Sequence, residues 1–483
     1  MKPATKDPEI AEAFVERLIS GKVTKEESLR FAQQRVEIVS FTMLAIQQRL
    51  ATLNAASGPN TPPATIPAYE KPSPKSGKGK KSKRKRGGQK GHAGAHRKPP
   101  PAPDRTRHQK LDDCPDCGGK LKDTGDTRTR LSEDIPEDLK PVVTQDIIHR
   151  DWCPKCKKRF EPKPPDLLPH CQIGNRTLVL SSMLHYLQGL TISQIVDTFN
   201  FHLRMGITHG GLVQMWHRLA KILYSWYEEI HQQSLQGSKL HADETGWRVE
   251  GQTHWLWCFN SDSTVYFMVD KSRGSPALQK FFTRYFDGTL ITDFWSPYDA
   301  VDCADKQKCW PHLLRDMSAV DEKYSDDKEW ASFSRRVSTV FRDAKKLHGV
   351  RSEMAESDYD EAVVRLEGRL SKVANDSWEH ADANRLSKRM AKYGNEMLTF
   401  LWYDDVASDN NAAERAIRPA VMIRKNSYAN QSEQGATTMA VMMSVFRTLK
   451  LRKIQPIEAI LNALTQYNHS GNLPKLPEVN SQR

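Results

Sequence analysis

The chain of 483 residues has no apolar run as long as the roughly 18 residues that a membrane-spanning helix needs. Its first residues, with Asp7, Glu9 and Glu12, lack the basic and apolar pattern of a secretory signal peptide. Cysteine is also scarce, since eight in so long a chain are too few for a disulfide scaffold. The sequence therefore excludes a membrane helix and predicts a cytoplasmic protein whose thiols stay reduced.

Acidic residues are absent from residues 71–98, where twelve Lys or Arg stand. This stretch supplies almost all of the net charge of +13. Basic residues among Gly, Ser and Pro cannot bury a core, so we expect the segment to stay disordered until it lies on a polyanion. Nucleic acid is the expected partner, held by phosphate contacts that weaken as salt rises. The residues expected to contact DNA here are Lys83, Arg84, Lys85, Arg86, Gln89, Lys90 and His92.

The chain is too long for one hydrophobic core, and its pattern changes several times. We expect a helical coiled-coil segment at 1–57, a disordered basic linker rich in Pro and Gly at 58–104, a zinc ribbon at 105–170, a helical helix-turn-helix-like DNA-binding region at 171–236, the first part of a catalytic core at 237–316, a helical insertion at 317–404, the second part of the core at 405–430 and C-terminal helices at 431–483.

Apolar residues between Leu29 and Leu53 recur at alternating steps of three and four, after a capping box formed by Thr24 and Glu27. This heptad pattern predicts a coiled coil that joins two subunits. A single helix lying on another domain remains the alternative, because a seam of about three heptads is near the lower limit for an independent coiled coil.

Four of the cysteines form two C-x-x-C pairs, which in a reducing compartment favours metal. They are Cys114, Cys117, Cys153 and Cys156. Four thiolates in tetrahedral array make a structural zinc site, with unrelated buried thiols as the alternative. The 35 residues between the pairs include a strand-like piece at 141–149 that could extend the hairpin of the ribbon. The other cysteines are expected to pack: Cys171, Cys258, Cys303 and Cys309.

Residues 177–224 follow a helical period, with Thr191 and Thr208 where N-caps would stand. A helix, a short helix, a turn and another helix are typical of a helix-turn-helix. Three-helix packing without DNA contact is the alternative. The residues of the last helix that could face a groove are Gln214, His217 and Arg218.

After Gly237 the pattern changes to that of strands. Strands are expected at 240–243, 254–259 and 264–269, a helix at 276–286 and a further strand at 289–293. Three strands, a helix and a fourth strand bearing an acid is the order of ribonuclease-H-like folds. Residues 317–403 have helical spacing without strand signals, which predicts the helical insertion. The expected fold class is therefore multidomain α+β with a ribonuclease-H-like α/β catalytic core.

Three acidic residues stand out by their setting: Asp243 and Asp293 at or near the ends of strand-like runs, and Glu414 at the start of a helix. Aspartate is a poor strand residue, so local preference is overridden at two of these positions, which tends to mark function. Carboxylates from distant positions can hold two divalent cations roughly 3.5–4 Å apart, an arrangement that cuts or joins phosphodiester bonds. The acids predict a metal-dependent DNA-processing enzyme.

The helix expected after Asp409, its predicted N-cap, brings amide, carboxylate and guanidinium groups to the face that holds Glu414. Pro419 forbids a simple continuous helix, so a kink or restart is expected there. The residues of this segment expected to contact phosphate or DNA are Asn411, Arg415, Arg418, Arg424 and Lys425. Plain helix-surface positions are the alternative for the first three.

Other candidates have quieter explanations. Glu244 adjoins Asp243 but would point to the opposite face of its strand, so it is not expected to be a ligand. Cys309 and His312 are spaced like half a metal site, yet packing and hydrogen bonding are their expected roles, with a second metal as the alternative. Tyr298 is expected to pack beneath the site or touch a base.

With these pieces in one chain, the sequence resembles the DDE transposases of the insertion sequence 66 group. The matching pieces are the heptad-bearing N-terminus, GGQKGH, the knuckles CPDCGG and CPKC, ADETGW, TDFWSPY, KCWPHLLRD, and DNNAAERAIRP followed by RKN. They cover nearly the whole chain in the family's order. DNNAAERAIRP is the most specific, and the joint occurrence is far stronger than any single match.

The resemblance implies that Asp243, Asp293 and Glu414 are a catalytic triad that binds magnesium in a ribonuclease-H-like fold. It implies a transposase that binds the ends of its mobile element, nicks DNA and joins the freed 3′ hydroxyl to a target. Two magnesium ions, for which manganese could substitute, and structural zinc are the expected cofactors. The expected partners are double-stranded DNA at the nucleoid, a second or further copy of the chain, and accessory proteins of the same element.

A catalytically silent DNA-binding regulator derived from a transposase is the alternative. The presence of all three acids argues against it, although intact motifs do not prove activity. A hydrolase that uses paired carboxylates on sugars would leave the basic segment, the knuckles and the heptads unexplained.

Overall fold

The computed structural model describes residues 139–169 and 171–478 without a break, most of residues 105–129, and isolated positions elsewhere. Of the heptad seam it describes only Val39, Met43 and Ile46, each of them helical. The basic segment with Lys83, Arg84, Lys85, Arg86, Gln89, Lys90 and His92 lies outside the described residues. The expectations of a coiled coil and a basic DNA-binding arm therefore stay predictions.

The chain divides into two compact units. One comprises Met1–Lys71, Gln145–Asp197 and Ile207–Arg483, and the other Pro72–Thr144 and Thr198–Gly206. The first unit is mixed α and β and holds all three acidic residues singled out above. Among the described residues, no helix is both long and apolar enough to cross a membrane.

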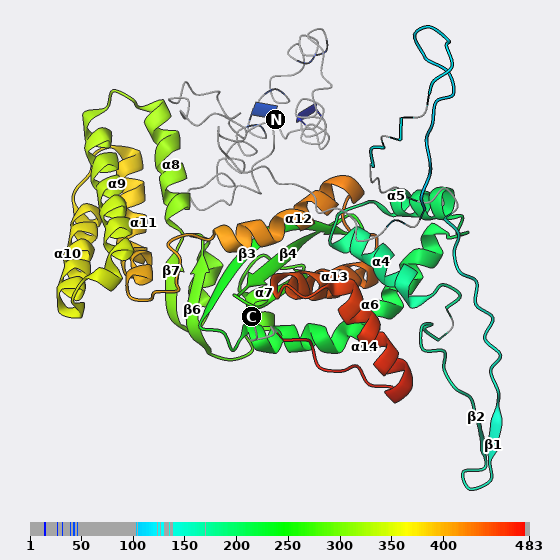
Figure 1. Cartoon of the computed structure of the whole chain (residues 1–483). Helices are drawn as coiled ribbons and strands as arrows, with labels where there is room; N and C mark the ends of the chain where they lie inside the picture. The colour runs from blue at the N-terminus through cyan, green and yellow to red at the C-terminus, as the bar shows by residue number, and fades with distance from the viewer. Residues whose placement is uncertain are drawn as a thin grey trace. The chain divides into compact units, whose positions relative to one another are not determined.

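A five-stranded mixed sheet lies at the centre of the first unit (Figure 1). In chain order its strands are β3 (Lys239–Val249), β4 (Gln252–Asn260), β5 (Val265–Asp270), β6 (Phe286–Thr292) and β7 (Cys303–Lys308). Their order across the sheet is β5-β4-β3-β6-β7; β3 runs antiparallel to β4 and β4 to β5, whereas β6 is parallel to β3 and β7. The four strands that the sequence predicts are confirmed. Strand β7 is an addition, because its sequence CADKQK lacks a strand-like apolar pattern.

Two of these elements differ in length from the prediction. Strand β3 continues beyond position 243 into a tight hairpin with β4, whose turn is formed by Glu250 (φ 52°) and Gly251 (φ 73°). Positive φ at both turn residues matches the twist of the flanking strands. The helix expected at 276–286 is shorter, since α7 (Ser275–Phe281) ends early and Phe286, fully buried, begins β6.

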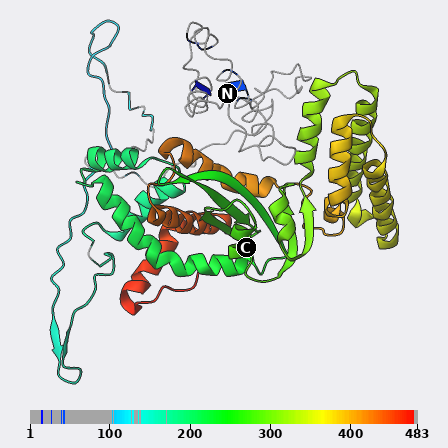
Figure 2. The same cartoon turned by 180° about the vertical axis from the view of Figure 1, so that it is seen from behind.

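Helices of the same unit pack on the sheet or on one another, as Figure 2 shows from behind. They are α4 (Asn175–Tyr186), α5 (Ile192–Asp197), α6 (His209–Ser234), α12 (Asn411–Ser427), α13 (Glu433–Leu451) and α14 (Pro456–Ser470). Of these, α6, α12 and α13 contact strands: α12 lies against β3 and β4, α6 against β5, and α13 against β5 and α6. The π-helix Thr198–His202 belongs to the other unit.

Helix α13 satisfies the free edge of the sheet at β5. The amide of Val265 donates to Thr448 Oγ1 over 3.0 Å, and that of Phe267 to Ser444 Oγ over 2.9 Å. An exposed edge strand would offer these amides to another chain. Because the hydroxyls of α13 take them, the sheet is closed on this side.

The caps expected for the helices around α5 are confirmed. Thr191 and Gln194 exchange bonds, with Oγ1 accepting the amide of Gln194 at 3.2 Å and Oε1 accepting that of Thr191 at 2.9 Å. Thr208 accepts the amide of Gly211 at 3.1 Å at the start of α6. Such reciprocal bonds satisfy the first amides of a helix.

Helix α6 is a core helix of the first unit. Its ring nitrogen His217 Nδ1 lies 2.7 Å from Thr438 Oγ1 of α13, and Trp216 beside it is buried. Gln214 and Arg218 are exposed, and Arg218 Nη1 also donates to Cys171 Sγ over 3.4 Å. The contact of His217 with α13 directs this side chain inward, so packing explains it better than groove recognition does.

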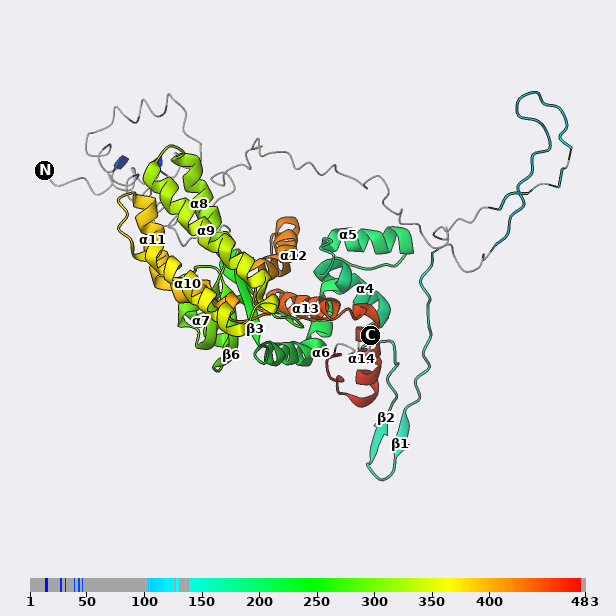
Figure 3. The same cartoon turned by 60° about the vertical axis from the view of Figure 1, so that its left-hand side comes forward.

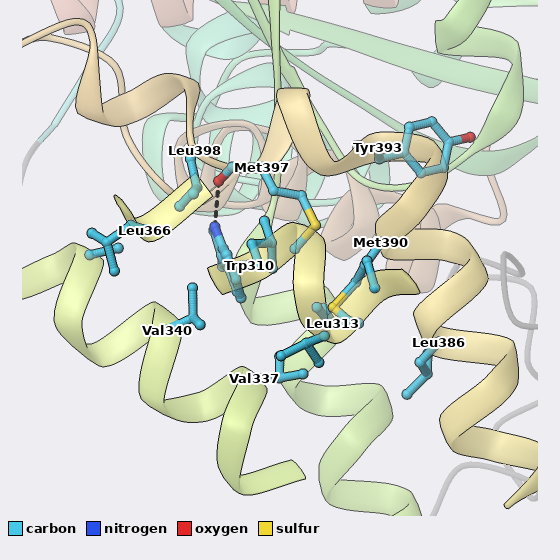
Figure 4. Packing of buried hydrophobic residues seen from close by; sticks show 14 of the residues in the cluster. Trp310, Leu313, Val337, Val340, Leu366, Leu386, Met390, Tyr393, Met397 and Leu398 are labelled. Carbon is cyan, nitrogen blue, oxygen red and sulfur yellow. Dashed lines mark hydrogen bonds between the residues drawn. The ribbon is translucent and has the colours of Figure 1, made fainter. Parts of the chain in front are cut away.

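Between β7 and α12 the chain forms a four-helix group whose members lie side by side (Figure 3). These helices are α8 (Trp310–Lys323), α9 (Lys328–Gly349), α10 (Glu356–Asn375) and α11 (Ala381–Met397). They share one apolar core, where Trp310 Nε1 donates to the carbonyl of Met397 over 2.5 Å (Figure 4). The core ties the start of α8 to the end of α11, so both ends of the group return to the sheet.

The structure bears on two expectations about local structure. Helix α12 is one helix from Asn411 to Ser427 with Pro419 inside it, so of the expected kink or restart the restart is wrong. Residues 141–149 form no strand; Val142 and Val143 are largely exposed, and without a buried face nothing stabilises an extended segment. A short hairpin of β1 (Asp151–Cys153) and β2 (Lys158–Phe160) follows instead.

Candidate functional site

Asp243 on β3 and Asp293 just after β6 lie near each other, because these neighbouring strands run parallel. The last paired residues of the parallel strands β3 and β6 are His241 and Ile291, and each aspartate stands two residues further on, Asp243 within β3 and Asp293 just past the end of β6. Neighbouring strands lie about 4.8 Å apart, and equal steps along parallel strands keep side chains on one face. The sheet therefore brings together two acids that are far apart in sequence.

Each aspartate is oriented by one backbone amide. Glu244 N–H donates to Asp243 Oδ1 over 2.9 Å, and Trp295 N–H donates to Asp293 Oδ1 over 2.8 Å. The second oxygen of each carboxylate has no hydrogen-bond donor within the described part of the chain. One oxygen of each is thus fixed while the other is available to a ligand.

The two carboxylates lie in an unfavourable electrostatic setting. Burial raises the pKa of Asp243 well above its ordinary value, and the charges of Glu244 and Asp293 raise it further. Burial also raises the pKa of Asp293, although the Trp295 amide and the Lys308 ammonium act in the opposite direction. Buried oxygen donors whose charges repel one another suit a hard divalent cation, which would remove the repulsion.

Glu414 stands in the first turn of α12, which Asn410 anchors to the sheet. Asn410 Nδ2 donates to the carbonyl of Ala242 over 2.7 Å, and its Oδ1 lies 3.1 Å from His241 Nδ1. Asn410 is also the N-cap residue, in place of the predicted Asp409, whose carboxylate accepts the amide of Asn411. The charge of Glu414 contributes to the raised pKa of Asp243.

Glu414 contacts side chains of α8. Its Oε1 accepts from Arg315 Nη2 over 3.0 Å and lies 3.8 Å from His312 Nε2. Burial lowers the pKa of His312 to about 4, and Arg315 adds to this effect. The imidazole is therefore neutral at physiological pH, and Arg315 supplies the countercharge to Glu414.

Within the described residues, only Cys309, His312 and Glu414 form a group of three ligand-type side chains with all ligand atoms within 4.8 Å of one another. The oxygens of Asp243, Asp293 and Glu414 do not approach so closely as a set. Glu414 would have to leave Arg315 and turn toward the aspartates to share a cation with them. Asp243, Asp293 and Glu414 all offer carboxylate oxygens, and the charges of Asp293 and Glu414 both raise the pKa of Asp243. Their chemistry therefore fits a divalent cation.

A layer of charged and aromatic groups lies beneath the aspartates. Glu244 is buried, accepts from Arg273 Nη2 over 3.1 Å and from Tyr298 Oη over 2.6 Å, and its pKa is raised to about 7, chiefly by burial. The Arg273 guanidinium stacks between Trp255 and Trp295, 4.4 and 4.2 Å from the ring centroids. Glu244 is thus held by two side chains, and Tyr298, which the sequence predicts to pack beneath the site or touch a base, is buried with its hydroxyl on Glu244.

Lys308, at the end of β7, is a buried cation next to the site. Its Nζ donates to Thr292 Oγ1 over 3.2 Å and lies 3.6 Å from Asp299 and 3.7 Å from Glu396. Burial lowers the pKa of Lys308, while these carboxylates oppose that shift. Its charge favours the ionised form of Asp293.

The sequence does not predict roles for Asn410, Arg273 and Lys308. Asn410 has a local signal in the run SDNNAAER, where either asparagine can cap. Arg273 and Lys308 have none, because their partners come from other strands and from α11.

The predicted DNA-binding residues of α12 occupy different environments. Arg415, Arg418 and Lys425 are exposed, and Asn411 is partly buried. Arg424 instead donates through Nη1 to Thr245 Oγ1 over 3.1 Å and to the carbonyl of Gly246. This Nη1 holds α12 on β3, so the expectation that Arg424 points toward DNA conflicts with its position.

The two C-x-x-C pairs lie in different compact units. Gly118, which follows Cys117, has φ 71°, and Lys157, which follows Cys156, has φ 51°. Backbone amides lower the pKa of Cys114 and of Cys153. Each loop therefore has a local form suited to a metal-bound thiolate, and the joint zinc site of Cys114, Cys117, Cys153 and Cys156 stays a prediction.

The chain is similar to curated proteins. Two similar curated proteins come from Sinorhizobium fredii (strain NBRC 101917 / NGR234). One, uncharacterized protein y4qI, is 26% identical over 265 residues, which are 48% of each chain, so the alignment spans about half of that relative's length. The other, uncharacterized protein y4hP, is 22% identical over 386 residues, 71% of this chain and 68% of the relative.

A family model described as "Transposase IS66 family" matches residues 170–438. This range is more than half of the 483 residues and includes Asp243, Asp293 and Glu414 together with the sheet and the four-helix group. The chain belongs to the transposase IS66 family.

Proposed function

We propose that the chain is a DNA transposase that binds the ends of a mobile element, cleaves a strand and joins the freed 3′ hydroxyl to target DNA. Its catalytic residues would be Asp243, Asp293 and Glu414. The observation that carries this proposal is the proximity of Asp243, on β3, to Asp293, just after the adjacent parallel strand β6, with the charges of Asp293 and Glu414 both acting on Asp243. Membership of the transposase family supports it.

The sheet order supports a ribonuclease-H-like core. Three antiparallel strands, β5, β4 and β3, continue into the parallel strands β6 and β7, with β3 in the centre. Under this proposal the first acid lies on the central strand, the second just after the adjacent strand, and the third on α12, which follows the inserted helices. The four-helix group is then an insertion between the second and third acids.

The carboxylates would act as oxygen ligands and the backbone would orient them. When bound, a pair of magnesium ions supplies activation of the attacking water or 3′ hydroxyl and stabilisation of the leaving oxygen. Asp243 and Asp293 present one oxygen each, because the amides of Glu244 and Trp295 hold the other. Glu414 would complete the site after release from Arg315. Manganese should substitute, since it accepts the same carboxylate and water ligands.

DNA would be held by positive groups around this site. On α12, Arg415, Arg418 and Lys425 are exposed and within the same helix as Glu414. Phosphate contacts by Lys and Arg position the substrate without reading its sequence. The basic arm, the zinc knuckles, pairing of subunits and accessory proteins of the element belong to the proposal as predictions from the sequence.

The proposal is tested by magnesium-dependent cleavage of DNA that carries the element's own ends. Wild type and Glu414→Gln are compared at matched DNA binding, with Glu458→Gln, an exposed residue of α14, as the control. Products from wild type and control alone support the proposal. DNA binding without products from any of the three, even with accessory proteins, would instead favour the catalytically silent regulator.

A further inference from the structure

Cys309, His312 and Glu414 form a cluster that the proposed catalysis does not use as a whole. Cys309 follows β7, His312 stands in the first turn of α8, and Glu414 in the first turn of α12. Their sulfur, nitrogen and oxygen ligand atoms all lie within 4.8 Å of one another. Two chain segments more than a hundred positions apart, 309–312 and 414, therefore converge on one point.

The sheet places Cys309 in the row of the two aspartates. The parallel register of β6 and β7 pairs Thr292 with Lys308, so the next position aligns Asp293 with Cys309. The amide of Cys309 donates to the carbonyl of Thr292 over 2.9 Å, which fixes this alignment. Cys309 thus stands next to the proposed catalytic site, with its sulfur within 4.8 Å of a carboxylate oxygen of Glu414.

The donor set suits a different metal from the one that the aspartates suit. A thiolate, an imidazole and a carboxylate are zinc ligands, with a water completing a tetrahedron. Bond lengths of about 2.0–2.3 Å give ligand-to-ligand separations of roughly 3.3–3.6 Å. The observed 3.8 Å between His312 Nε2 and Glu414 Oε1 is close to this value. Small side-chain shifts would close the cluster around an ion.

The surroundings of Cys309 fix the position of its sulfur, although burial raises the pKa of this thiol to about 12 and so favours its protonated form until a cation binds. Cys309 Sγ is buried and accepts the amide of Asn410 over 3.2 Å. Amide donors of this kind orient and stabilise metal-bound ligands. The side chains of His312 and Glu414 are 17% and 28% exposed, so an ion can enter from their side. Arg315 is half exposed and could turn to solvent when Glu414 takes up an ion.

We propose that Cys309, His312 and Glu414 bind one zinc ion, and that this ion inhibits the transposase by keeping Glu414 away from the magnesium site. The inhibitory part rests on the proposed function, because it requires Glu414 to be a catalytic ligand. The zinc-binding part does not. Zinc and magnesium then compete for one carboxylate, so zinc availability would set the fraction of active enzyme.

Zinc binding is tested first, without DNA, by equilibrium dialysis of the full chain. Wild type should bind one equivalent of zinc more than Cys309→Ala, whereas Cys303→Ala, which alters a partly buried cysteine outside the cluster, should bind as wild type does. His312→Gln should weaken this equivalent roughly tenfold or more. Cobalt added in place of zinc should show a sulfur-to-cobalt charge-transfer band that is weaker in Cys309→Ala than in Cys303→Ala.

Equal zinc stoichiometry for wild type, Cys309→Ala and His312→Gln would overturn the site. His312→Gln keeps the test decisive if Cys309→Ala does not fold, because the imidazole lies nearer the surface.

The second experiment measures how zinc inhibits DNA cleavage at saturating magnesium. Wild type should be inhibited at a zinc concentration roughly tenfold lower than His312→Gln. Equal inhibition of both would overturn the inhibitory role, whereas an inactive wild type that still binds the extra zinc would count against the proposed function alone.

Discussion

The side-chain amide of Asn410 donates to the carbonyl of Ala242 over 2.7 Å, which ties the start of α12 to the residue before Asp243. This bond crosses 168 positions of sequence and the whole four-helix group. Its effect is to fix Glu414, one helical turn further on, relative to β3. The buried amide of Asn410 therefore helps to set the spacing of the proposed catalytic acids, together with Arg424, which also holds α12 on β3.

Asn410→Ala should lower both stability and cleavage. The carbonyl of Ala242 and His241 Nδ1 would lose their buried partner, which costs about 1–3 kcal/mol. Urea denaturation measures this loss, and a larger fall in kcat than in DNA affinity would show misplacement of Glu414. Asn375→Ala, an exposed change at the end of α10, is the control and should alter neither. A variant of Asn410 as stable as wild type would contradict the anchoring role.

Asp243→Asn should make the protein more stable at neutral pH in the absence of divalent cations. The pKa of Asp243 is raised in the folded state. The stability that the protonated carboxyl contributes is therefore fully present below the unfolded pKa of about 4. It is lost as pH rises through the folded pKa. The neutral amide removes this loss, worth about 1.4 kcal/mol for each pKa unit. Thermal melts at pH 7 and at pH 3.5 check it.

The gain from Asp243→Asn should be present at pH 7 and vanish at the acid end. Magnesium should raise the Tm of wild type at pH 7 more than that of the variant, because binding to the folded state stabilises it. If Asp243→Asn were less stable than wild type at pH 7 without magnesium, this would contradict the claim that burial and the neighbouring charges destabilise the ionised carboxylate of Asp243.

Arg273→Ala should destabilise the protein strongly, since it leaves the buried carboxylate of Glu244 without its cation. Side-chain exposures of 14% for Arg273 and 1% for Glu244 place this pair in the range of about 3–5 kcal/mol for removal of one partner. Adding Glu244→Gln to Arg273→Ala should restore part of the loss. Additive effects in this double-mutant cycle, measured in urea, would show that the two groups do not interact.

Arg315→Gln should lower the magnesium concentration for half-maximal cleavage. Arg315 and Glu414 are 50% and 28% exposed, so their pair is worth about 0–1 kcal/mol, and removing it should shift the half-saturating concentration about two- to fivefold. A magnesium titration of initial rates measures the shift. An increase in the required concentration would contradict competition between Arg315 and the cation.

Much of the fold follows from local pattern. The strands β3, β4 and β5 are identified by apolar and aromatic runs, and helical spacing identifies the inserted helices. Elements that are stabilised by residues distant in the sequence cannot be predicted from local pattern. Strand β7 is polar, yet Gln307 and Lys308 are buried. The side chain of Gln307 donates to the carbonyl of Met397, and that of Lys308 pairs with Asp299 and Glu396.

The site shows the same division. The sequence singles out Asp243, Asp293 and Glu414 as candidates because acids interrupt strand-like runs and a cap-like run precedes the helix, and their catalytic role stays a proposal. Their alignment depends on the register of β3 with β6, which no local signal sets. The pairing of Glu414 with Arg315 rather than with the aspartates, and the sandwich of Arg273 between Trp255 and Trp295, arise from side chains of separate elements.

The most direct test of the proposed site is strand joining with pre-cleaved element ends. This substrate supplies the 3′ hydroxyl, so the assay isolates one chemical step from end cleavage. Wild type, Asp243→Asn, Asp293→Asn and Glu414→Gln are compared at matched DNA binding, with the exposed Asp302→Asn as the control. We predict that wild type and control join DNA with magnesium or manganese, and that each of the three variants loses at least about a hundredfold in rate. Joining at the wild-type rate by any of the three would contradict the assignment of the catalytic acids.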